Sequence, residues 1–406
     1  MAKGAVVIVG AGHAGFQLAA SLRQAGFKEP VFLINDEAHL PYQRPPLSKA
    51  YLKGSAGPDS LMFRPDKFYR DQTIELIHDR VTSIDRAARK VTLASGAALD
   101  YGHLVLATGA RNRLLDIPNA NLSDVRYLRI LDDSEALRPL LASRKRVVVI
   151  GAGFIGLEFA ATARIKGLEV DVIELGPRVM ARAVTAEVSE YFQKQHSAAG
   201  IRILLGVQAT SIESDGKTVT GVSLSDGRHL PADLVVVGVG VLPNVELAAE
   251  AGLSAASGII VNEHLLTSDP DISAIGDCAL FESARFGGSL RLESVQNATD
   301  HARCVAARLT GDAKPYDGQP WFWSDQGDDK LQIAGLTTGY DRVVLRGDPA
   351  AKAFSAFCYK AGALVGIESV NRAGDHMFGR RLLAAGGSIA PDNAADVSFD
   401  LKKALG

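Results

Sequence analysis

Hydrophobic and polar positions along the chain form a pattern of buried strands and helices that occurs twice. A β-branched apolar run, typical of a buried strand, leads into a glycine-rich turn, and a helix-forming run follows. A further glycine ends the helix, and a second apolar strand closes the unit at acidic residues. The expected elements are Ala5–Val9, Phe16–Gln24 and Val31–Ile34 in the first copy, and Arg146–Ile150, Leu157–Lys166 and Val170–Ile173 in the second.

The two copies are related by a shift of 141 residues, so that Gly10-Ala-Gly-His-Ala-Gly15 returns as Gly151-Ala-Gly-Phe-Ile-Gly156. Strand, tight turn, helix and parallel strand make up a βαβ unit, and a turn of this kind is typical of dinucleotide binding. The repeat therefore predicts two dinucleotide-binding domains.

The first turn carries the glycines that a dinucleotide pyrophosphate needs. Gly10 permits the sharp turn, Gly12 lets the backbone approach the phosphates, and Gly15 packs the helix on the strand. The phosphates then lie at the positively polarised N-terminus of the helix, where Ala14 is a further predicted contact. Asp36, 21 residues after Gly15, is placed to accept hydrogen bonds from a ribose. Glycine turns are common, but this one follows a strand, opens a helix and is followed by the acid, which favours a binding site.

The second turn repeats this geometry and is followed by its own acid, Glu174, which lies 18 residues beyond Gly156. A carboxylate there hydrogen-bonds the free 2′-hydroxyl of NADH and repels the 2′-phosphate of NADPH, so NADH is the expected nucleotide. Use of NADPH stays an alternative because Arg178 and Arg182 lie nearby, and an arginine can accommodate the 2′-phosphate. The residues of this turn predicted to bind the nicotinamide dinucleotide are Gly151, Gly153, Ile155 and Gly156.

The rest of the chain is rich in strands, and its pattern changes at Trp321. Beyond that residue, strand-like runs precede an expected helix over His376–Leu383, which is typical of a separate α+β domain. A loop is expected over residues 388–393, before a short C-terminal helix. The further expected strands are Val91–Leu93, Leu104–Ala107, Leu234–Val237, Leu331–Ile333, Arg342–Leu345, Ala353–Tyr359 and Ala363–Ser369.

Composition and charge restrict the class of protein. The 406 residues suit two or three domains, and 40 glycines suit loops that approach ligands closely. A net charge of −2 gives no support for nucleic-acid binding or for a polybasic membrane segment. Cys278, Cys304 and Cys358 are far apart and form no C-x-x-C, which argues against a disulfide framework and a zinc site. No apolar stretch of about 18 residues and no signal peptide pattern occurs, so a cytoplasmic protein is expected.

Several short strings lie outside the glycine turns: Pro41-Tyr-Gln-Arg-Pro-Pro-Leu-Ser-Lys49, Ala107-Thr-Gly109, Gly238-Val-Gly-Val-Leu-Pro-Asn244, Ile275-Gly-Asp277, Glu293-Ser-Val-Gln-Asn-Ala298 and Pro320-Trp-Phe-Trp-Ser-Asp-Gln326. Over essentially its whole length the chain resembles the oxygenase-coupled, FAD-dependent NADH:ferredoxin reductases, the putidaredoxin reductase-like family. The resemblance implies a glutathione-reductase-like α/β fold, with two Rossmann-like dinucleotide-binding domains and a C-terminal α+β domain. The implied domains are 1–110 with 238–320 for FAD, 111–237 for NAD, and 321–406 for the C-terminal domain.

The resemblance also implies roles for single residues. Asp277 would bind the ribityl chain of FAD, Val295 would contact the flavin ring, and Lys49 would lie beside the flavin, paired with Glu158. An ammonium there favours the anionic reduced flavin, and Glu158 would hold it in place. The alternative is that Lys49 is a solvated surface lysine. The remaining implied contacts are Arg44, Val81, Ala107 and Arg129 for FAD, and Gly240 for NADH.

The segment Leu40–Tyr51 contains no cysteine, which argues against disulfide-reductase and cysteine-dependent peroxidase chemistry. Because flavin can release electrons singly, an external carrier fits, and the resemblance implies a two-iron ferredoxin as a transient partner of a monomer. The alternatives are an NADH oxidase, another NADH-dependent reductase such as rubredoxin reductase, and a signalling flavoprotein. Two interpretations stay open for Trp321 and Trp323. Their side chains line the flavin or the ferredoxin-docking surface, or they pack beneath a domain interface. Residues 321–406 carry ten basic and ten acidic side chains, so no docking surface is predicted.

Overall fold

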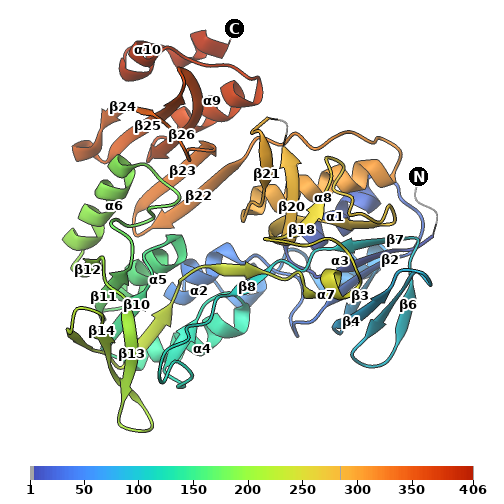
Figure 1. Cartoon of the computed structure of the whole chain (residues 1–406), viewed down its shortest axis with the longest axis horizontal. Helices are drawn as coiled ribbons and strands as arrows, with labels where there is room; N and C mark the ends of the chain where they lie inside the picture. Colours follow the sequence, from blue (N-terminus) through green and yellow to red (C-terminus); the bar gives the residue numbers. More distant parts are fainter. Residues whose placement is uncertain (1–3, 284, 406) are drawn as a thin grey trace. The chain divides into compact units, whose positions relative to one another are not determined.

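The computed structural model describes residues 4–283 and 285–405 and divides the chain into two compact units. Two of the passages from one unit to the other fall within short strands, β8 (Ala110–Asn112) and β17 (Val241–Pro243), and Figure 1 labels the elements. The first unit takes in the chain up to Gln43, Pro58–Arg111 and Leu242–Gly318, and the second takes in Arg44–Gly57, Asn112–Val241 and the chain from Gln319 on.

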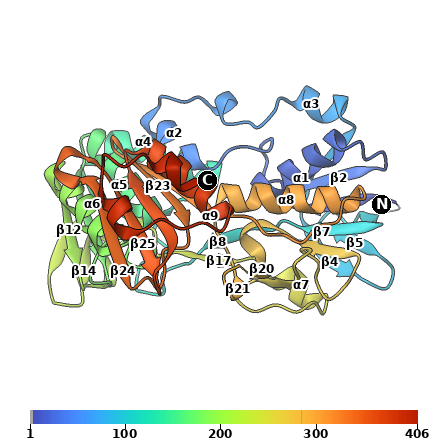
Figure 2. The same cartoon turned by 90° about the horizontal axis from the view of Figure 1, so that it is seen from above.

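The first unit is built on a parallel sheet with the strand order β19-β7-β1-β2-β3. All four residues of the central strand β1 (Val6–Val9) are buried. Two helices, α1 (His13–Gln24) and α8 (Val295–Leu309), pack against each other, as Figure 2 shows. The other elements are β2 (Val31–Asn35), α3 (Asp66–Asp71), β3 (Ile74–His78), β4 (Val81–Asp85), β5 (Lys90–Leu93), β6 (Ala98–Asp100), β7 (His103–Leu106), α7 (Glu246–Glu250), β18 (Ile259–Val261), β19 (Ile272–Ala274), β20 (Ala279–Ser283) and β21 (Gly288–Leu290), with the 3-10 helices η2 (Pro58–Ser60) and η3 (Gly276–Cys278).

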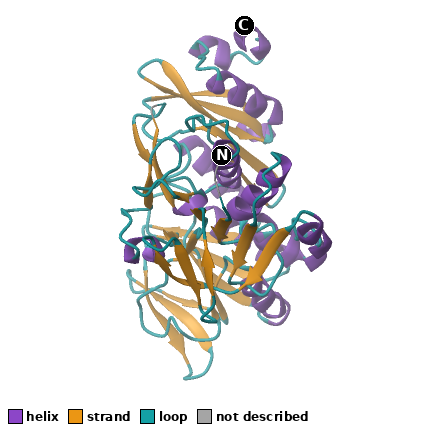
Figure 3. Cartoon of the chain, turned by 90° about the vertical axis from the view of Figure 1, so that its right-hand side faces the viewer, coloured by secondary structure: helices purple, strands orange, loops and turns teal. Residues whose placement is uncertain are grey.

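The second unit repeats this design with the parallel sheet β12-β11-β10-β16-β9. Helix α5 (Phe154–Ile165) follows β10 (Arg146–Ile150). Figure 3 distinguishes the helices of the chain, in purple, from its strands, in orange. The other elements of this part are η1 (Pro45–Ser48), α2 (Ala50–Lys53), β9 (Val125–Tyr127), α4 (Leu131–Ser143), β11 (Glu169–Glu174), α6 (Ala186–Ala198), β12 (Ile201–Leu205), β13 (Ala209–Ser214), β14 (Val219–Leu224), β15 (His229–Pro231) and β16 (Leu234–Val237).

The C-terminal part of the second unit is an antiparallel sheet with the order β22-β23-β26-β25-β24, coloured orange to red in Figure 1. Helix α9 (Ala373–Ala384) packs on β23 and β26 and shares an apolar core with them. The other elements are β22 (Trp321–Gln326), β23 (Asp329–Gly335), β24 (Arg342–Asp348), η4 (Pro349–Ala351), β25 (Ala353–Lys360), β26 (Ala363–Val370), α10 (Pro391–Ala395) and η5 (Leu401–Leu405).

The predicted α/β fold with two dinucleotide-binding units is confirmed. Both helices that follow the glycine turns begin three residues earlier than expected, because Gly12 and Gly153 are their N-caps and the turn itself enters the helix. The loop expected over residues 388–393 is only partly a loop, since Pro391 begins α10. Proline suits the first helical position, where no N–H is needed. In residues 4–283 and 285–405, no helix combines the length and apolar character that crossing a membrane requires.

Candidate functional site

The first glycine turn joins the end of β1 to the start of α1. Gly10 has φ +104°, and a β-carbon there would lie 2.3 Å from the carbonyl oxygen of Ala107. A β-carbon at Gly15 would lie 1.8 Å from the Gly10 carbonyl oxygen, so both positions require glycine. Gly12 differs, because apart from the residue itself and its two chain neighbours no atom of the described residues lies within 4 Å of the place its β-carbon would take. This open space at the N-terminus of a helix fits a dinucleotide pyrophosphate.

The other residues predicted around this turn gather at one edge of the first sheet. Asp36 follows β2, Ala107 follows β7, and Asp277 comes shortly after β19. Because these strands run parallel to β1, their carboxyl ends meet at the edge where the glycine turn lies. A β-carbon at Gly276 would lie only 3.1 Å from Cβ of Ala14, so the Asp277 segment closely approaches α1. Open parallel sheets bind their ligands at this edge.

The second turn repeats the arrangement between β10 and α5. Gly151 has φ +103°, and a β-carbon there would lie 2.5 Å from the carbonyl oxygen of Gly238. A β-carbon at Gly156 would lie 2.1 Å from the Gly151 carbonyl oxygen. Around the β-carbon position of Gly153, the described part of the chain places no atom within 4 Å beyond this residue and its two chain neighbours. Ile155 in the first turn of α5 is 46% exposed, an unusual exposure for a large apolar side chain. The second turn therefore offers the same space as the first.

Glu174 lies directly against the second glycine turn. Its Oε2 accepts a hydrogen bond from the Ala152 N–H at 2.8 Å, and its Oε1 accepts one from the Gly176 N–H at 2.7 Å. The neighbouring Arg178 donates instead to three carbonyl oxygens of residues 181–185. Its guanidinium is thus engaged in holding a loop, whereas the carboxylate of Glu174 faces the turn.

Lys49 and Glu158 form an ion pair, with 3.0 Å between Lys49 Nζ and Glu158 Oε1. The Glu158 side chain is only 3% exposed and that of Lys49 15%, so Lys49 is not the solvated lysine of the alternative interpretation. Ser48 Oγ donates to Glu158 Oε2 at 2.5 Å, and Ser324 Oγ donates to Oε1 at 2.7 Å. Burial raises the pKa of Glu158, while the charge of Lys49 and these hydrogen bonds oppose the shift.

The remaining predicted residues lie at element ends. Val81 is buried at the start of β4, shortly after β3, and Val295 is the first residue of α8. Arg44 Nη1 donates to the carbonyl oxygen of Arg129 at 3.0 Å, so these two predicted FAD contacts are neighbours within the second unit. Gly240 has φ +103°, which favours glycine at this position.

Strand β22 presents different side chains on its two faces, as alternation along a strand requires. On one face Ser324 bonds Glu158, and the Phe322 ring packs against a phenylalanine of α5 with 4.6 Å between ring centroids. On the other face the rings of Trp321 and Trp323 lie 5.5 Å apart, and the Arg380 guanidinium of α9 lies 4.2 Å from the Trp321 ring centroid. One face of the Trp321 ring is therefore covered by a side chain of α9.

The sequence reasoning assigned no role to Ser48 or Ser324, although each donates to Glu158. The sequence did single out the segments that contain these serines, because Arg-Pro-Pro-Leu-Ser-Lys and Trp-Ser-Asp-Gln are two of the strings that mark the family resemblance. The strings indicate the family, but the sequence does not show that the two serines form hydrogen bonds with Glu158.

Known protein families and solved structures resemble this chain over most of its length. A family model described as pyridine nucleotide-disulphide oxidoreductase matches residues 4–302, and one described as reductase C-terminal matches residues 321–405. Rhodocoxin reductase of Rhodococcus erythropolis is 49% identical, over 98% of this chain and 94% of its own. The ferredoxin reductase for the CYP199A2 system from Rhodopseudomonas palustris is 71% identical, with a TM-score of 0.98 and all of both chains covered. The reductase in a covalent putidaredoxin reductase–putidaredoxin complex is 41% identical, with a TM-score of 0.97 over 100% of this chain and 99% of that one.

Proposed function

The chain belongs to the pyridine nucleotide-disulphide oxidoreductase family, and from this membership we propose that it is the NADH-dependent ferredoxin reductase of an oxygenase system. It is an oxidoreductase that uses FAD and a nicotinamide dinucleotide. In this function a hydride passes from NADH to FAD, and single electrons then pass to a two-iron ferredoxin. The observation that carries the proposal is the pair of glycine turns, each with open space beside its second glycine.

The site residues take their roles from this arrangement. Lys49 would place a positive charge where negative charge develops during reduction, and Glu158 would hold the ammonium there. We keep the domain boundaries 1–110 with 238–320, 111–237, and 321–406. The proposed FAD contacts are Gly10, Gly12, Ala14, Gly15, Asp36, Arg44, Lys49, Val81, Ala107, Arg129, Asp277 and Val295, and the proposed NADH contacts are Gly151, Gly153, Ile155, Gly156, Glu174 and Gly240.

The preference for NADH over NADPH rests on Glu174. Its carboxylate lies at the turn where the adenosine ribose of a bound dinucleotide would come, and it would repel a 2′-phosphate. The donors of Arg178 are engaged by backbone carbonyls, which removes one of the two arginines that kept NADPH open. Arg182 is exposed and is the residue whose replacement would reveal any residual use of NADPH.

An external acceptor of electrons from the flavin is favoured because the environments of the cysteines do not suit thiol redox chemistry. Cys278 and Cys358 are buried, and burial raises the pKa of both thiols. Cys304 is partly buried, and burial raises the pKa of its thiol as well. A transient complex with a ferredoxin fits the solved relative that is joined covalently to putidaredoxin. That the chain acts as a monomer in the cytoplasm stays a prediction.

The test is anaerobic and aerobic turnover of the purified yellow protein with defined acceptors. NADH oxidation should rise at least tenfold when a two-iron ferredoxin is added, and kcat/KM for NADH should exceed that for NADPH by at least tenfold. Rapid NADH oxidation with oxygen alone would select the oxidase, and stimulation by rubredoxin instead of ferredoxin would select the rubredoxin reductase. Failure of NADH to bleach the flavin would reject every reductase assignment.

A further inference from the structure

A chain of buried hydrogen bonds leads to Glu158 along the face of β22 that carries Ser324. Gln326 Nε2 donates to Ser324 Oγ at 3.2 Å, and His196 Nε2 of α6 lies 2.8 Å from Gln326 Oε1. Ser324 is completely buried, and Gln326 and His196 are each 4% exposed. The sequence of contacts is therefore His196, Gln326, Ser324, Glu158 and finally Lys49.

Every hydrogen bond in this chain points toward Glu158. A carbonyl oxygen only accepts, so the Nε2 proton of His196 is donated to Gln326 Oε1, which leaves the amide nitrogen to donate to Ser324. The same amide nitrogen also lies 3.3 Å from Met180 Sδ, a weak acceptor that fits this orientation. Because Ser324 Oγ already accepts from Gln326, its single proton is directed to the carboxylate.

The position of the Lys49 ammonium depends on whether it pairs with Glu158 or with Asp325. Its Nζ lies 3.0 Å from Glu158 Oε1 and 3.9 Å from Asp325 Oδ2, and the Asp325 side chain is 38% exposed. Ser324 holds the Glu158 oxygen that faces Lys49, since both bind Oε1. Without that hydroxyl, the serine that still holds Glu158 is Ser48, which binds the other oxygen, Oε2. The oxygen that faces Lys49 is then no longer held by a serine, and the ammonium can move toward Asp325.

We propose that Ser324 is a positioning residue for reduction of the flavin: its hydroxyl fixes Glu158, which fixes Lys49, and Gln326 fixes the hydroxyl. The inference rests on the proposed function, in which the Lys49 ammonium assists hydride transfer. Ser324 lies in residues 321–405, the segment matched by the reductase C-terminal family model, so this segment contributes to the reaction with NADH as well.

The first test is stopped-flow reduction of the FAD-loaded protein by NADH in Ser324→Ala, Gln326→Leu and Lys49→Ala. Loss of a hydrogen bond to a charged group should lower the limiting rate about tenfold in Ser324→Ala, and less in Gln326→Leu, with the NADH dissociation constant unchanged. Ser355→Ala is the matched control, because Ser355 is a completely buried serine of the same sheet whose hydroxyl donates to a carboxylate, Asp375 Oδ2, and lies 3.0 Å from Ser369 Oγ. Its limiting rate should equal that of the unaltered protein.

The second test is an infrared titration of the buried carboxyl group, which needs no turnover. The Ser324 hydroxyl stabilises the ionised carboxylate, so the band of protonated Glu158 should appear at higher pH in Ser324→Ala and be absent from Glu158→Gln. A band that does not move in folded Ser324→Ala overturns the inference, as does a rate lowered equally by Ser355→Ala. If Lys49→Ala slows reduction and Ser324→Ala does not, the inference alone fails. If neither slows it, the proposed role of Lys49 fails and the inference fails with it.

Discussion

At the scale of single residues, the glycines of each turn fall into two kinds. Gly10, Gly15 and their counterparts are required by the fold, because a β-carbon would collide with backbone oxygens. Gly12 and Gly153 have φ values of −69° and −78°, which any residue adopts, and the described atoms leave their β-carbon positions open. The fold therefore does not require glycine at these two positions, whereas the proposed contact with a dinucleotide pyrophosphate does.

Replacing each of these glycines by alanine should separate the two cofactors. Gly12→Ala should fold normally but bind FAD at least tenfold more weakly, because the added methyl group occupies the space of the pyrophosphate. Gly153→Ala should keep its FAD and show at least a tenfold larger dissociation constant for NADH. Flavin content by absorbance and NADH titration measure the two effects, and each variant is the control for the other. Loss of FAD from Gly153→Ala alone would reverse the assignment of the turns.

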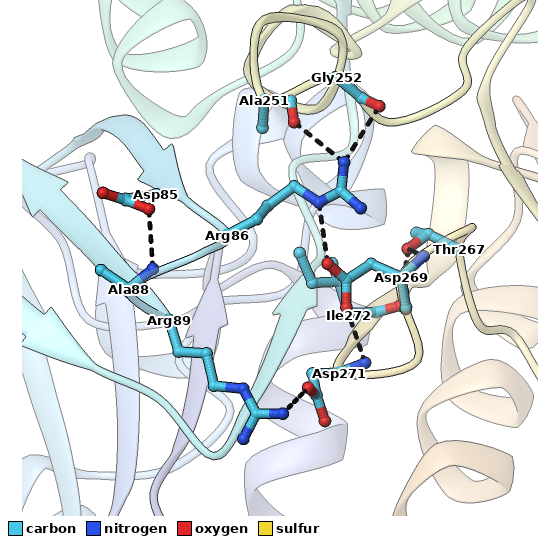
Figure 4. Close-up of polar contacts among 10 residues, drawn as sticks. All are labelled: Asp85, Arg86, Ala88, Arg89, Ala251, Gly252, Thr267, Asp269, Asp271 and Ile272. Atoms are coloured by element: carbon cyan, nitrogen blue, oxygen red, sulfur yellow. Dashed lines mark hydrogen bonds and ion pairs between the residues drawn. The ribbon is translucent and has the colours of Figure 1, made fainter.

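At the scale of elements, the turn between β4 and β5 is fastened to residues 251–272 by two arginines (Figure 4). Arg86 Nε donates to Asp269 Oδ2 at 2.8 Å, and its Nη1 donates to the carbonyl oxygens of Ala251 and Gly252, just after α7, at 3.4 and 3.3 Å. Burial acts to raise the pKa of Asp269, but the hydrogen bonds from Arg86 and from the Asp271 N–H lower it overall. Arg89 pairs with Asp271 in a more exposed position.

The two arginines should differ in their effect on stability. Arg86→Ala removes a charge-assisted contact from a carboxylate that is 14% exposed, and we expect the free energy of unfolding to fall by about 1–2 kcal/mol. Arg89→Ala is the control, with an expected loss below about 1 kcal/mol because that ion pair is largely exposed. Urea unfolding of both variants in the same buffer measures the difference. Equal losses would show that Arg86 does not fasten the turn.

The elements themselves could be predicted where one face is apolar and the other polar. Strand β22 is the instructive exception, because Trp321, Phe322 and Trp323 are apolar on both faces. Its periodicity predicts neither which face meets α5 nor that Ser324 should be buried. The burial of that serine follows from the helix that covers it, which lies more than 150 residues earlier in the chain.

At the scale of the whole molecule, Glu368 joins the C-terminal sheet to α6 within the second unit. Its side chain is completely buried on β26, and it accepts hydrogen bonds from the N–H and the hydroxyl of Thr185, the N-cap of α6. Burial raises its pKa to about 7, although the contacts with Thr185 and Thr337 and the charge of Arg178 oppose the shift. A carboxyl group between two elements thus titrates near neutral pH.

This shift should make stability depend on pH in a defined direction. Glu368 is protonated more readily in the folded than in the unfolded chain, so its contribution is full below its ordinary pKa and is lost as pH rises toward 7. Between pH 5 and pH 8 the free energy of unfolding should fall by about 2.5 kcal/mol relative to that of Glu368→Gln, which does not titrate. Urea unfolding of both proteins at the two pH values measures this. A difference between them that is independent of pH would contradict the shift.

The sequence by itself determined the two βαβ units, their glycines and the acids that follow them. These features depend on residues within about 30 positions of one another, and the pairing of parallel strands brings their carboxyl ends to one edge whatever the rest of the chain does. Only the tertiary structure decided that Ser48 and Ser324 both donate to Glu158, across 110 and 166 residues of chain. A hydrogen bond requires its two atoms to lie within about 3 Å, and hydrophobic periodicity fixes which face a residue is on but not which distant side chain it meets.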